Sequence, residues 1–378
     1  MSNYGPHLDS LLLHMVTLGA SDLYVTVDSP PVYRVDGVGR SGRHKATAAD
    51  LEGLAAALLS PTQRTEFAEK LEMNVAVSRG GQRFRVNLFR QRGAIGMVVR
   101  LVRTDVPTLD KLRHPPVLRR IAESKRGLVL LVGATGSGKS TTLAAMIDHR
   151  NAIASGHIVT VEDPIEFVHA HKQCVITQRE VGVDTRTYGD ALKSALRQAP
   201  DVVLIGEIRD AQTMEAALAF AETGHLCLST LHANNANQAI ERVLSFFGAE
   251  RHAEIVHQLA LNLRAIVSQR LLPDTTGGRA AALEILLDTP RVKDLVKNRE
   301  IDALKDAMEQ SAADGCQTFD SALLSLVVSS RISIADAIAA ADSPNDLRLK
   351  IERARGANGE RRAGLRLLPD QAQTRRAS

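Results

Sequence analysis

Eight residues, GATGSGKS from Gly133 to Ser140, carry the clearest chemical signal in the sequence. They fit the pattern G-x-x-x-x-G-K-[ST] and lie between an apolar run and a stretch with helical spacing. In such a loop the glycines let backbone N–H groups turn towards phosphate oxygens. We predict that Lys139 places its charge between the β- and γ-phosphates and that Ser140 binds Mg²⁺. The residues expected to contact the nucleotide are Gly133, Ala134, Thr135, Gly136, Ser137, Gly138, Lys139, Ser140 and Thr141.

Hydrolysis of a bound nucleotide also needs carboxylates, and two apolar segments end in acidic residues. The segment HIVTVED ends with Glu162 and Asp163, and VVLIGE ends with Glu207. Ligands of open parallel sheets lie at the carboxyl ends of the strands, so we expect these acids near the phosphates and Mg²⁺. We predict that Glu162 polarises the attacking water and that Glu207 lies next to the metal ion.

Other interpretations of these acids remain open. Asp163 precedes a proline and could form a turn, and Glu166 could be a solvated loop charge. Glu207 could instead form an ion pair with Arg209. Three carboxylates within five residues repel one another, which favours a positive group opposite them, such as Mg²⁺ together with Lys139.

Two histidines flank the apolar segment LCLST, residues 226–230. His232 follows this segment, where a side chain could contact the γ-phosphate, and His225 precedes it. Each histidine could instead have a purely structural role, and position alone does not separate the two interpretations.

The segments around these residues predict an α/β fold. Four continuous apolar runs are typical of buried strands. These runs are residues 128–133, 157–163, 202–207 and 226–230. Stretches with helical spacing alternate with them, among them residues 187–199 and 210–224, the second with Asp210 as its N-cap. This alternation indicates a mainly parallel sheet covered by helices on both faces, and after about residue 235 the sequence predicts mostly helices.

The first hundred residues predict a smaller α+β domain. Residues 8–18 have helical spacing, and residues 19–40 alternate as a strand meander around a proline pair. Residues 48–71 have helical character with Thr47 as a possible N-cap, and residues 82–102 read as two strands joined by a turn.

We predict four segments along the chain. An N-terminal domain covers residues 1–103, a proline-containing linker covers residues 104–115, and a second domain covers residues 116–350. Residues 351–378 form a basic tail. From Arg353 to Ser378 there are seven arginines and two acids without periodicity, which predicts disorder. Such a tail could be attracted to an anionic membrane or could be a solvated extension without a role.

Composition excludes several classes of protein. Of the 378 residues, 44% are hydrophobic and 24% are charged, as in soluble globular proteins. We expect no membrane-spanning helix and no signal peptide. The three cysteines form no CxxC pair, so we expect neither a disulfide framework nor a zinc site. This cysteine pattern is typical of a protein in the reducing cytoplasm. With 3% aromatic residues and a nearly neutral chain outside the tail, we expect no nucleic-acid partner.

Four ordered segments resemble one family. GATGSGKSTT, TVEDPIEF, ALRQAPDVVLIGEIRD and TGHLCLSTLHANNA resemble the Walker A, Asp-box, Walker B and His-box segments of type II/IV secretion ATPases. The similarity extends to GASDLYVTVDSPPVYRVDG and FRVNLFRQRG near the N-terminus. It is strongest to the type IV pilus retraction motors of the PilT/PilU branch.

This resemblance implies a fold, ligands and an assembly. The fold would be a PAS-like N-terminal domain followed by a RecA-like P-loop ATPase domain with C-terminal helices. The assembly would be a homohexameric ring, with ATP and Mg²⁺ bound between the two domains of one subunit. Residue by residue, Glu162 corresponds to the general base and Glu207 to the Walker B glutamate next to Mg²⁺. His225 and His232 correspond to the His-box histidines.

The arginine pair of the family falls on Arg85 and Arg100, both within the predicted strand pair. Such arginines could neutralise charge on the transferring phosphoryl group, in cis or in trans. Without the resemblance, both would read as exposed arginines on the face of a strand.

Some features differ from the PilT-type pattern. The segment TPRVKDLVKNREI, residues 289–301, carries two more charged residues than the AIRNLI-like segment of PilT-type motors. Together with GCQTFD, residues 315–320, and the basic tail, this resembles the PilU-type paralogue, an accessory retraction ATPase. Many secretion and pilus-assembly ATPases carry a four-cysteine cluster that this sequence lacks.

These observations together predict a hexameric Mg²⁺-dependent ATPase that is cytoplasmic, peripheral to the inner membrane, and drives or assists type IV pilus retraction. Rotation between the two domains would act on an inner-membrane platform protein, with a PilT-type ATPase as a second partner. One alternative is an accessory ring that binds ATP, turns it over slowly and stabilises a PilT-type motor. A pilus-extension or type II secretion ATPase is a further alternative.

Overall fold

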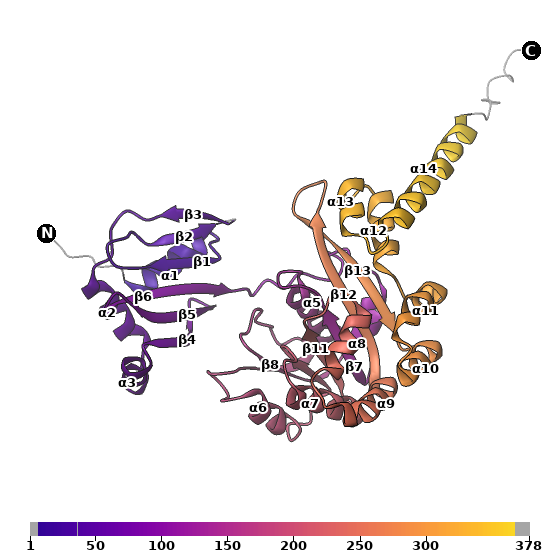
Figure 1. Ribbon diagram of the computed structural model, residues 1–378. Coiled ribbons are helices and arrows are strands. Elements are labelled where there is room, and N and C mark those ends of the chain that lie inside the picture. Colours follow the sequence, from indigo (N-terminus) through magenta and orange to yellow (C-terminus); the bar gives the residue numbers. More distant parts are fainter. Residues whose placement is uncertain (1–6, 36, 367–378) are drawn as a thin grey trace, which may run out of the picture. The chain divides into compact units, whose positions relative to one another are not determined.

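The computed structural model describes residues 7–35 and 37–366, with side chains up to residue 355 (Figure 1). Contacts within the chain divide it into two compact units. The first unit joins the described residues up to 108 with residues 147–206, and the second joins residues 109–146 with the described residues from 207 onward.

A six-stranded antiparallel sheet with the order β3-β2-β1-β6-β5-β4 forms one part of the first unit. The strands are β1 Asp22–Val25, β2 Val32–Val35, β3 Val38–Ser41, β4 Glu72–Arg79, β5 Gln82–Gln91 and β6 Ala94–Val102. Along β5, Phe84, Val86 and Leu88 are buried in the apolar core. Because side chains alternate along a strand, the arginines at positions 83 and 85 lie on the opposite face.

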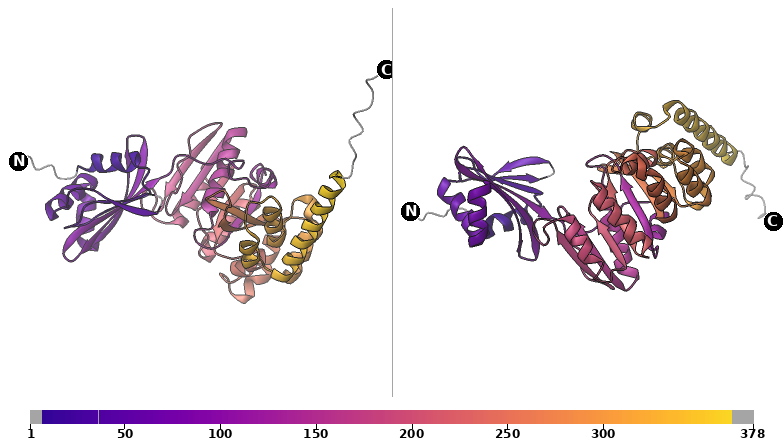
Figure 2. Two further views of the ribbon diagram at one scale, coloured as in Figure 1. Left: turned by 90° about the horizontal axis from the view of Figure 1, so that it is seen from above. Right: turned by 60° about the horizontal axis from the view of Figure 1, so that its bottom comes forward.

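Three helices contribute to the apolar core of this sheet. They are α1 Leu8–Thr17, α2 Ala48–Leu58 and α3 Pro61–Lys70 (Figures 1 and 2). Leu12, Leu51 and Phe67, one from each helix, join the strand residues in a single buried cluster. Thr47 caps α2 as predicted. The stretch 48–71 is helical as predicted but forms two helices, because Ser60 forms a second capping box and the proline after it begins a new helix.

Three parallel strands in the order β10-β8-β9 form the other part of the first unit. They are β8 Gly156–Glu162, β9 Cys174–Glu180 and β10 Val202–Ile205, with helix α6 Tyr188–Ala195 between β9 and β10 in the chain. The predictions of strands at 157–163 and 202–207 are confirmed as β8 and β10. The sequence analysis did not predict β9, whose residues CVITQRE are mixed apolar and polar rather than a continuous apolar run.

The second unit contains four strands in the order β13-β12-β7-β11. They are β7 Gly127–Val132, β11 Leu226–Leu231, β12 Leu263–Pro273 and β13 Arg279–Leu287. Strands β11 and β12 run parallel to β7 on either side of it, and β13 pairs antiparallel with β12. Every residue of β7 and of β11 is buried, as their continuous apolar sequences predict.

Helices α8 (Ala236–Leu244) to α14 (Pro344–Arg366) confirm that the chain is mostly helical after residue 235, and the hairpin β12–β13 is an addition that the sequence did not predict. The two strands pair from Ala265 with Leu287 to Pro273 with Arg279. Short apolar runs such as those in β12 and β13 fit either a strand or a buried helix, and periodicity alone does not distinguish the two. Pairing of β12 with β7, more than a hundred residues earlier, decides for the strand.

Helices make up most of the rest of the second unit, and one of them, α5, begins in this unit and ends in the first. They are α4 Val117–Ala122, α5 Lys139–Ile153, α7 Ala211–Glu222, α8 Ala236–Leu244, α9 His252–Asn262, α10 Pro290–Asn298, α11 Leu304–Gln310, α12 Phe319–Val328, α13 Ile334–Ala340 and α14 Pro344–Arg366. Asp210 caps α7 as predicted. Helices α12, α13 and α14 lie together beside the hairpin β12–β13 (Figures 1 and 2).

The C-terminal segment differs from its prediction. The sequence predicts disorder from residue 351, but helix α14 continues to Arg366 in the structure. Leu347 and Ile351 are buried against α12 and α13, and alanine and arginine, which are frequent in the following residues, favour helix. Residues 367–378 lie outside the described residues. Within the described residues, no helix combines the length and the apolar character needed to cross a membrane.

Candidate nucleotide-binding site

The predicted phosphate cradle lies between strand β7 and helix α5, as its sequence pattern requires. Gly136 and Gly138 have φ angles of 79° and 88°, which residues with a side chain rarely adopt. A Cβ atom on Gly138 would lie 2.7 Å from Nε2 of Gln269, and one on Gly133 would lie 2.6 Å from the carbonyl oxygen of Gln269. The glycines therefore let the loop pass directly against β12.

Lys139, the first residue of α5, is buried and reaches back over the loop. Its Nζ atom donates hydrogen bonds to the carbonyl oxygens of Gly133 at 2.7 Å and Ala134 at 3.0 Å. The Oγ atom of Ser137 is also buried and, among the described residues, has no hydrogen-bond partner. A buried hydroxyl without a partner is costly. Both groups therefore fit an incoming phosphate, which would accept their hydrogen bonds.

Two pockets open onto this loop. The first, of about 470 Å³, is lined by Gly133, Ala134, His232, Asn234, Gln238 and other residues of α8. The second, of about 400 Å³, is lined by the cradle together with Asn234, Gln269, Arg270, Leu271 and Arg279. The cradle therefore has open space on both sides, bounded by α8 on one and by the hairpin β12–β13 on the other.

His232 and Glu207 lie at the edge of the sheet that carries the cradle. Strand β11 runs parallel to β7 with Leu231 opposite Val132, so the residues after the two strands share one edge. The Nε2 atom of His232 lies 3.0 Å from Oε1 of Glu207. The other oxygen of this carboxylate accepts a hydrogen bond from Nε of Arg209 at 2.8 Å. The pairing of Glu207 with Arg209, left open by the sequence, is therefore present beside the contact with His232.

His225 lies at the opposite end of β11, because the next residue pairs with Gly127, the first residue of β7. Its Nδ1 atom lies 3.0 Å from Oγ1 of Thr223 and 3.1 Å from the carbonyl oxygen of Phe220. Its ring meets that of Phe220 edge-on, with centroids 5.6 Å apart. The structure thus does not bring the two predicted histidines together within the second unit.

Ser140 and Glu207 are the residues predicted to hold Mg²⁺. Ser140 is half-buried as the second residue of α5, and the side chain of Glu207 is 18% exposed. Both belong to the second unit. A hydroxyl and a carboxylate are oxygen ligands of the kind that Mg²⁺ prefers, and Mg²⁺ commonly completes its shell with water and substrate phosphates. The donor set therefore fits a magnesium ion bound together with a nucleotide.

Glu162 ends strand β8 in the first unit. Its Oε1 atom accepts hydrogen bonds from Oγ1 of Thr160 at 2.7 Å and from Nε2 of Gln178 at 3.3 Å. Burial raises the pKa of Glu162 to about 7, against the opposing effect of these hydrogen bonds. A carboxylate with a pKa near 7 is suited to accept a proton from water at neutral pH. Asp163 and Glu166 are exposed, in line with their alternative interpretations as turn and solvated residues.

Arg85 on β5 and Arg100 on β6 lie directly opposite each other on the face of the six-stranded sheet that points away from its apolar core. Asp22 on β1 lies opposite Arg100 on its other side. The Oδ1 atom of this buried aspartate accepts a hydrogen bond from Nε of Arg100 at 2.8 Å, while the Arg100 side chain is 66% exposed. Nε of the Arg100 guanidinium is therefore bound by Asp22, while most of the side chain remains exposed to solvent.

Three residues that support the cradle, Glu162 and Arg100 were not predicted from the sequence. Gln269 packs against the cradle and accepts a hydrogen bond from Oγ1 of Thr142 at 2.8 Å, but it lies on a strand that was not predicted. Gln178 lies on β9, which was also not predicted. Asp22 lies within GASDLYV, where the alternation of residues places it on a strand face but does not reveal its partner.

Comparisons with known proteins identify the family. Residues 7–323 match the family model of type II/IV secretion system proteins. The chain belongs to this family. It is 50% identical over 347 residues to the type IV pilus ATPase PilU of Pseudomonas aeruginosa, covering 91% of each chain. It is 41% identical over 328 residues to the retraction ATPase PilT of the same organism, covering 86% of this chain and 95% of that one.

A solved structure agrees with these relatives. The crystal structure of the pilus retraction motor PilT with bound ADP is similar with a TM-score of 0.84 at 36% identity, covering 91% of this chain and 99% of the other. This member of the secretion ATPase family is therefore a P-loop ATP hydrolase of the PilT/PilU branch. The predicted α/β fold class is confirmed.

Proposed function

We propose that the chain forms a homohexameric, Mg²⁺-dependent motor that drives or assists type IV pilus retraction from the cytoplasmic face of the inner membrane. The observation that carries this proposal is the phosphate cradle, where Lys139 and a Ser137 hydroxyl without a partner among the described residues converge at one loop. Similarity to PilU and PilT supports the assignment to pilus retraction. A platform protein of the inner membrane and a PilT-type ATPase are the proposed partners.

The residues of the site have separate tasks in this proposal. Lys139 and the backbone of the cradle bind the phosphates, and Ser140 with Glu207 would hold Mg²⁺, which supplies positive charge against the phosphate oxygens. His232 orients the carboxylate of Glu207 through their 3.0 Å contact. Glu162 accepts the proton of the attacking water. A pKa near 7 supports this role, because the group is then partly ionised at neutral pH and still basic enough to take a proton.

Arg85 and Arg100 stabilise the negative charge of the transferring phosphoryl group in this proposal. The hydrogen bond from Nε of Arg100 to Asp22 leaves the tip of the guanidinium exposed, which supports contact with a ligand. We also propose that residues 1–103 and 116–350 are the two domains that rotate against each other. The six-stranded sheet ends at residue 102 and strand β7 begins at residue 127, which supports this boundary.

Steady-state ATP hydrolysis by the purified chain, measured beside the Glu162→Ala variant, tests this proposal. We expect turnover in the wild type and its loss in the variant, with nucleotide binding retained in both. Turnover that survives in Glu162→Ala would contradict the role of Glu162. A wild type that neither binds nor hydrolyses ATP would contradict the motor itself.

An accessory ring is the second candidate function, and two observations favour it. The chain is 50% identical to PilU and 41% identical to PilT of one organism, and helix α10 carries the additional charges of the segment 289–301. Such a ring would bind ATP, hydrolyse it slowly and stabilise a PilT-type motor. Normal twitching motility in cells that carry Glu162→Ala would favour this candidate, and lost motility would favour the motor.

A further inference from the structure

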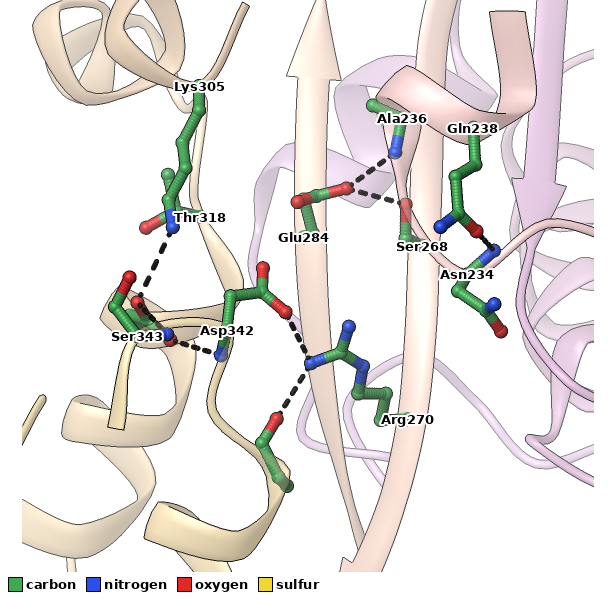
Figure 3. Close-up of polar contacts among 12 residues, drawn as sticks. Asn234, Ala236, Gln238, Ser268, Arg270, Glu284, Lys305, Thr318, Asp342 and Ser343 are labelled. Carbon is green, nitrogen blue, oxygen red and sulfur yellow. Dashed lines mark hydrogen bonds and ion pairs between the residues drawn. The ribbon is translucent and has the colours of Figure 1, made fainter. Parts of the chain in front are cut away.

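Arg270 on β12 borders the phosphate cradle and uses only part of its hydrogen-bonding capacity. It lines the pocket of about 400 Å³ together with cradle residues, among them Ala134 and Ser137. Its Nη1 atom donates a hydrogen bond to the carbonyl oxygen of Ala340 at 2.7 Å and lies 2.8 Å from Oδ1 of Asp342 (Figure 3). Among the described residues, neither Nε nor Nη2 of Arg270 has a hydrogen-bond partner.

The guanidinium of Arg270 is held in a fixed position. Its central carbon lies 3.8 Å from the centroid of the Phe319 ring, within the range of a cation–π contact. The side chain is 28% exposed. A guanidinium that is already oriented loses less conformational entropy when its remaining donors bind an anion, and its planar fork suits phosphate oxygens. The unused donors therefore have the geometry of a preorganised anion-binding group.

The partners of Arg270 belong to a network that holds the start of helix α14. Asp320 is buried and accepts hydrogen bonds from the backbone N–H groups of Asp342 at 2.9 Å and Ser343 at 3.2 Å. Lys305 lies 3.6 Å from the same carboxylate. Figure 3 shows this series of contacts running from Arg270 through Asp342 to Lys305. Ser343 directly precedes α14, so the network fixes where this helix begins.

The opposite wall of the cradle is anchored to the same pair of strands. The buried carboxylate of Glu284 on β13 accepts hydrogen bonds from the backbone N–H of Ala236 at 2.7 Å and from Oγ of Ser268 at 2.8 Å (Figure 3). Ala236 is the first residue of α8, whose residues line the pocket on the other side. Helix α8 on one side of the cradle is therefore fixed to the hairpin β12–β13, which itself lines the other side. Arg270 lines the pocket of about 400 Å³ and also contacts residues 340 and 342, which precede α14.

We propose that Arg270 is a further nucleotide-binding residue whose Nε and Nη2 donors bind a phosphate or ribose oxygen of the nucleotide held in the cradle. This inference rests on the proposed nucleotide site. Because Nη1 stays bound to Ala340 and Asp342, a nucleotide at Arg270 also stabilises the anchoring of α14. Coupling of this kind is reciprocal, so loosening the anchor weakens nucleotide binding as well.

The first test measures the affinity of the full chain for Mg²⁺-ADP by isothermal titration calorimetry. Arg270→Ala should weaken binding by about tenfold or more, the effect of losing hydrogen bonds to a charged group. Arg270→Lys keeps the charge but loses the fork of donors and should fall between the alanine variant and the wild type. Arg264→Ala is the matched control, because Arg264 lies on the same strand and pairs with Asp288 at 2.7 Å at the opposite end. Its affinity should equal that of the wild type.

The second test measures hydrogen exchange of residues 340–355 with and without ADP. In the wild type and in Arg264→Ala, ADP should slow exchange in this segment. In Asp342→Ala the guanidinium keeps its charge and its hydrogen bond to Ala340 but loses its contact with the carboxylate, so the slowing by ADP should be smaller than in the wild type. This readout distinguishes coupling from a general loss of stability, which would speed exchange with and without ADP alike.

Several outcomes would overturn the inference. Wild-type affinity in Arg270→Ala, measured beside a Lys139→Ala variant that has lost binding, would overturn this inference and leave the proposed site intact. Equal weakening in Arg270→Ala and Arg264→Ala would indicate general destabilisation and would also overturn it. A wild type that does not bind ADP would overturn the inference and the proposed function together.

Discussion

The two ends of strand β11 carry the same kind of residue in different surroundings. At the carboxyl end, His232 contacts the carboxylate of Glu207 beside the phosphate cradle. At the amino end, His225 contacts a hydroxyl, a backbone carbonyl and the Phe220 ring. The first histidine meets an ionisable group at the binding edge, and the second completes local packing. The edge of the sheet at which each histidine lies, rather than its residue type, therefore decides which groups its side chain contacts.

The same contrast holds for the other polar groups at the two edges. At the carboxyl edge the hydroxyl of Ser137 is buried without a partner among the described residues. At the amino edge, Asp288 is bound by both Arg264 at 2.7 Å and Lys293 at 3.1 Å. A site that binds a ligand needs polar groups whose bonds the ligand completes, whereas a structural cluster satisfies itself. The carboxyl edge is therefore the edge prepared for a ligand.

The largest expected effect concerns Glu162, at the carboxyl end of β8. We predict that Glu162→Gln lowers the turnover number for ATP by about 10²–10⁴-fold, the usual contribution of a general base, and leaves ATP affinity unchanged. A phosphate-release assay measures the first quantity and calorimetry the second. The matched control is Glu166→Gln, an exposed acid beside the same strand end that should retain turnover. An equal loss of turnover in Glu162→Gln and Glu166→Gln would contradict a specific role of Glu162 as the general base.

The next effect compares a lysine at each edge. Lys139→Ala removes the buried charge of the cradle and should weaken Mg²⁺-ADP binding on the order of 100-fold, since hydrogen bonds from a charged group to phosphate are strong. Lys125→Ala, at the amino edge beside β7, should bind ADP as the wild type does. Titration calorimetry on both variants checks the prediction. Tight binding by Lys139→Ala would mean that the cradle is not the phosphate site.

The two histidines give a direct test of the comparison, with a smaller effect. His232→Ala should lower turnover by about tenfold, because Glu207 loses an orienting partner, with little change in melting temperature. His225→Ala should lower the melting temperature by a few degrees, because its edge-on contact with the Phe220 ring is lost, with turnover per folded protein unchanged. The family resemblance placed both histidines in the His box, whereas position alone left a structural role open for each. A loss of turnover in His225→Ala without loss of stability would support a catalytic role for both histidines and break the comparison.

The smallest effect is a pH dependence. Burial raises the pKa of Glu162 to about 7 from an ordinary 4.5. Between pH 4.5 and 7 the folded chain therefore keeps a proton on this carboxyl group that the unfolded chain has released. The free energy of unfolding should therefore fall as pH rises from 4.5 to 7, and Glu162→Gln should lack this contribution. Melting temperatures of both proteins across this range give the measurement. Parallel curves would mean that the carboxyl group is not perturbed.

Local sequence was sufficient for some elements and not for others. Thr47 and Asp210 cap helices as predicted, because an N-cap depends on residues within one turn. The break between α2 and α3 was missed even though Pro61 marks it, since helical spacing continues on both sides. The hairpin β12–β13 and strand β9 were missed for another reason. Their residues become strands by pairing with β7 and β8, which are distant in the chain.

The sequence by itself determined the parts of the site that depend on neighbouring residues. The glycines, Lys139 and Ser140 follow one another in the chain, and a motif with a fixed backbone path needs little help from elsewhere. It also determined that Glu162 ends one apolar strand and that Glu207 follows another, because the apolar runs stop at these acids.

Only the tertiary structure decided which distant groups meet. It placed His232 at the same edge as the cradle because β11 runs parallel to β7, which leaves His225 at the other edge. It placed Asp22 against Arg100 through strand register, and it brought Arg270 to Asp342 through the docking of the C-terminal helices. The register of paired strands and the docking of helices depend on the burial of whole faces of these elements. The free energy of such burial is summed over many residues, and no single segment of the sequence carries it.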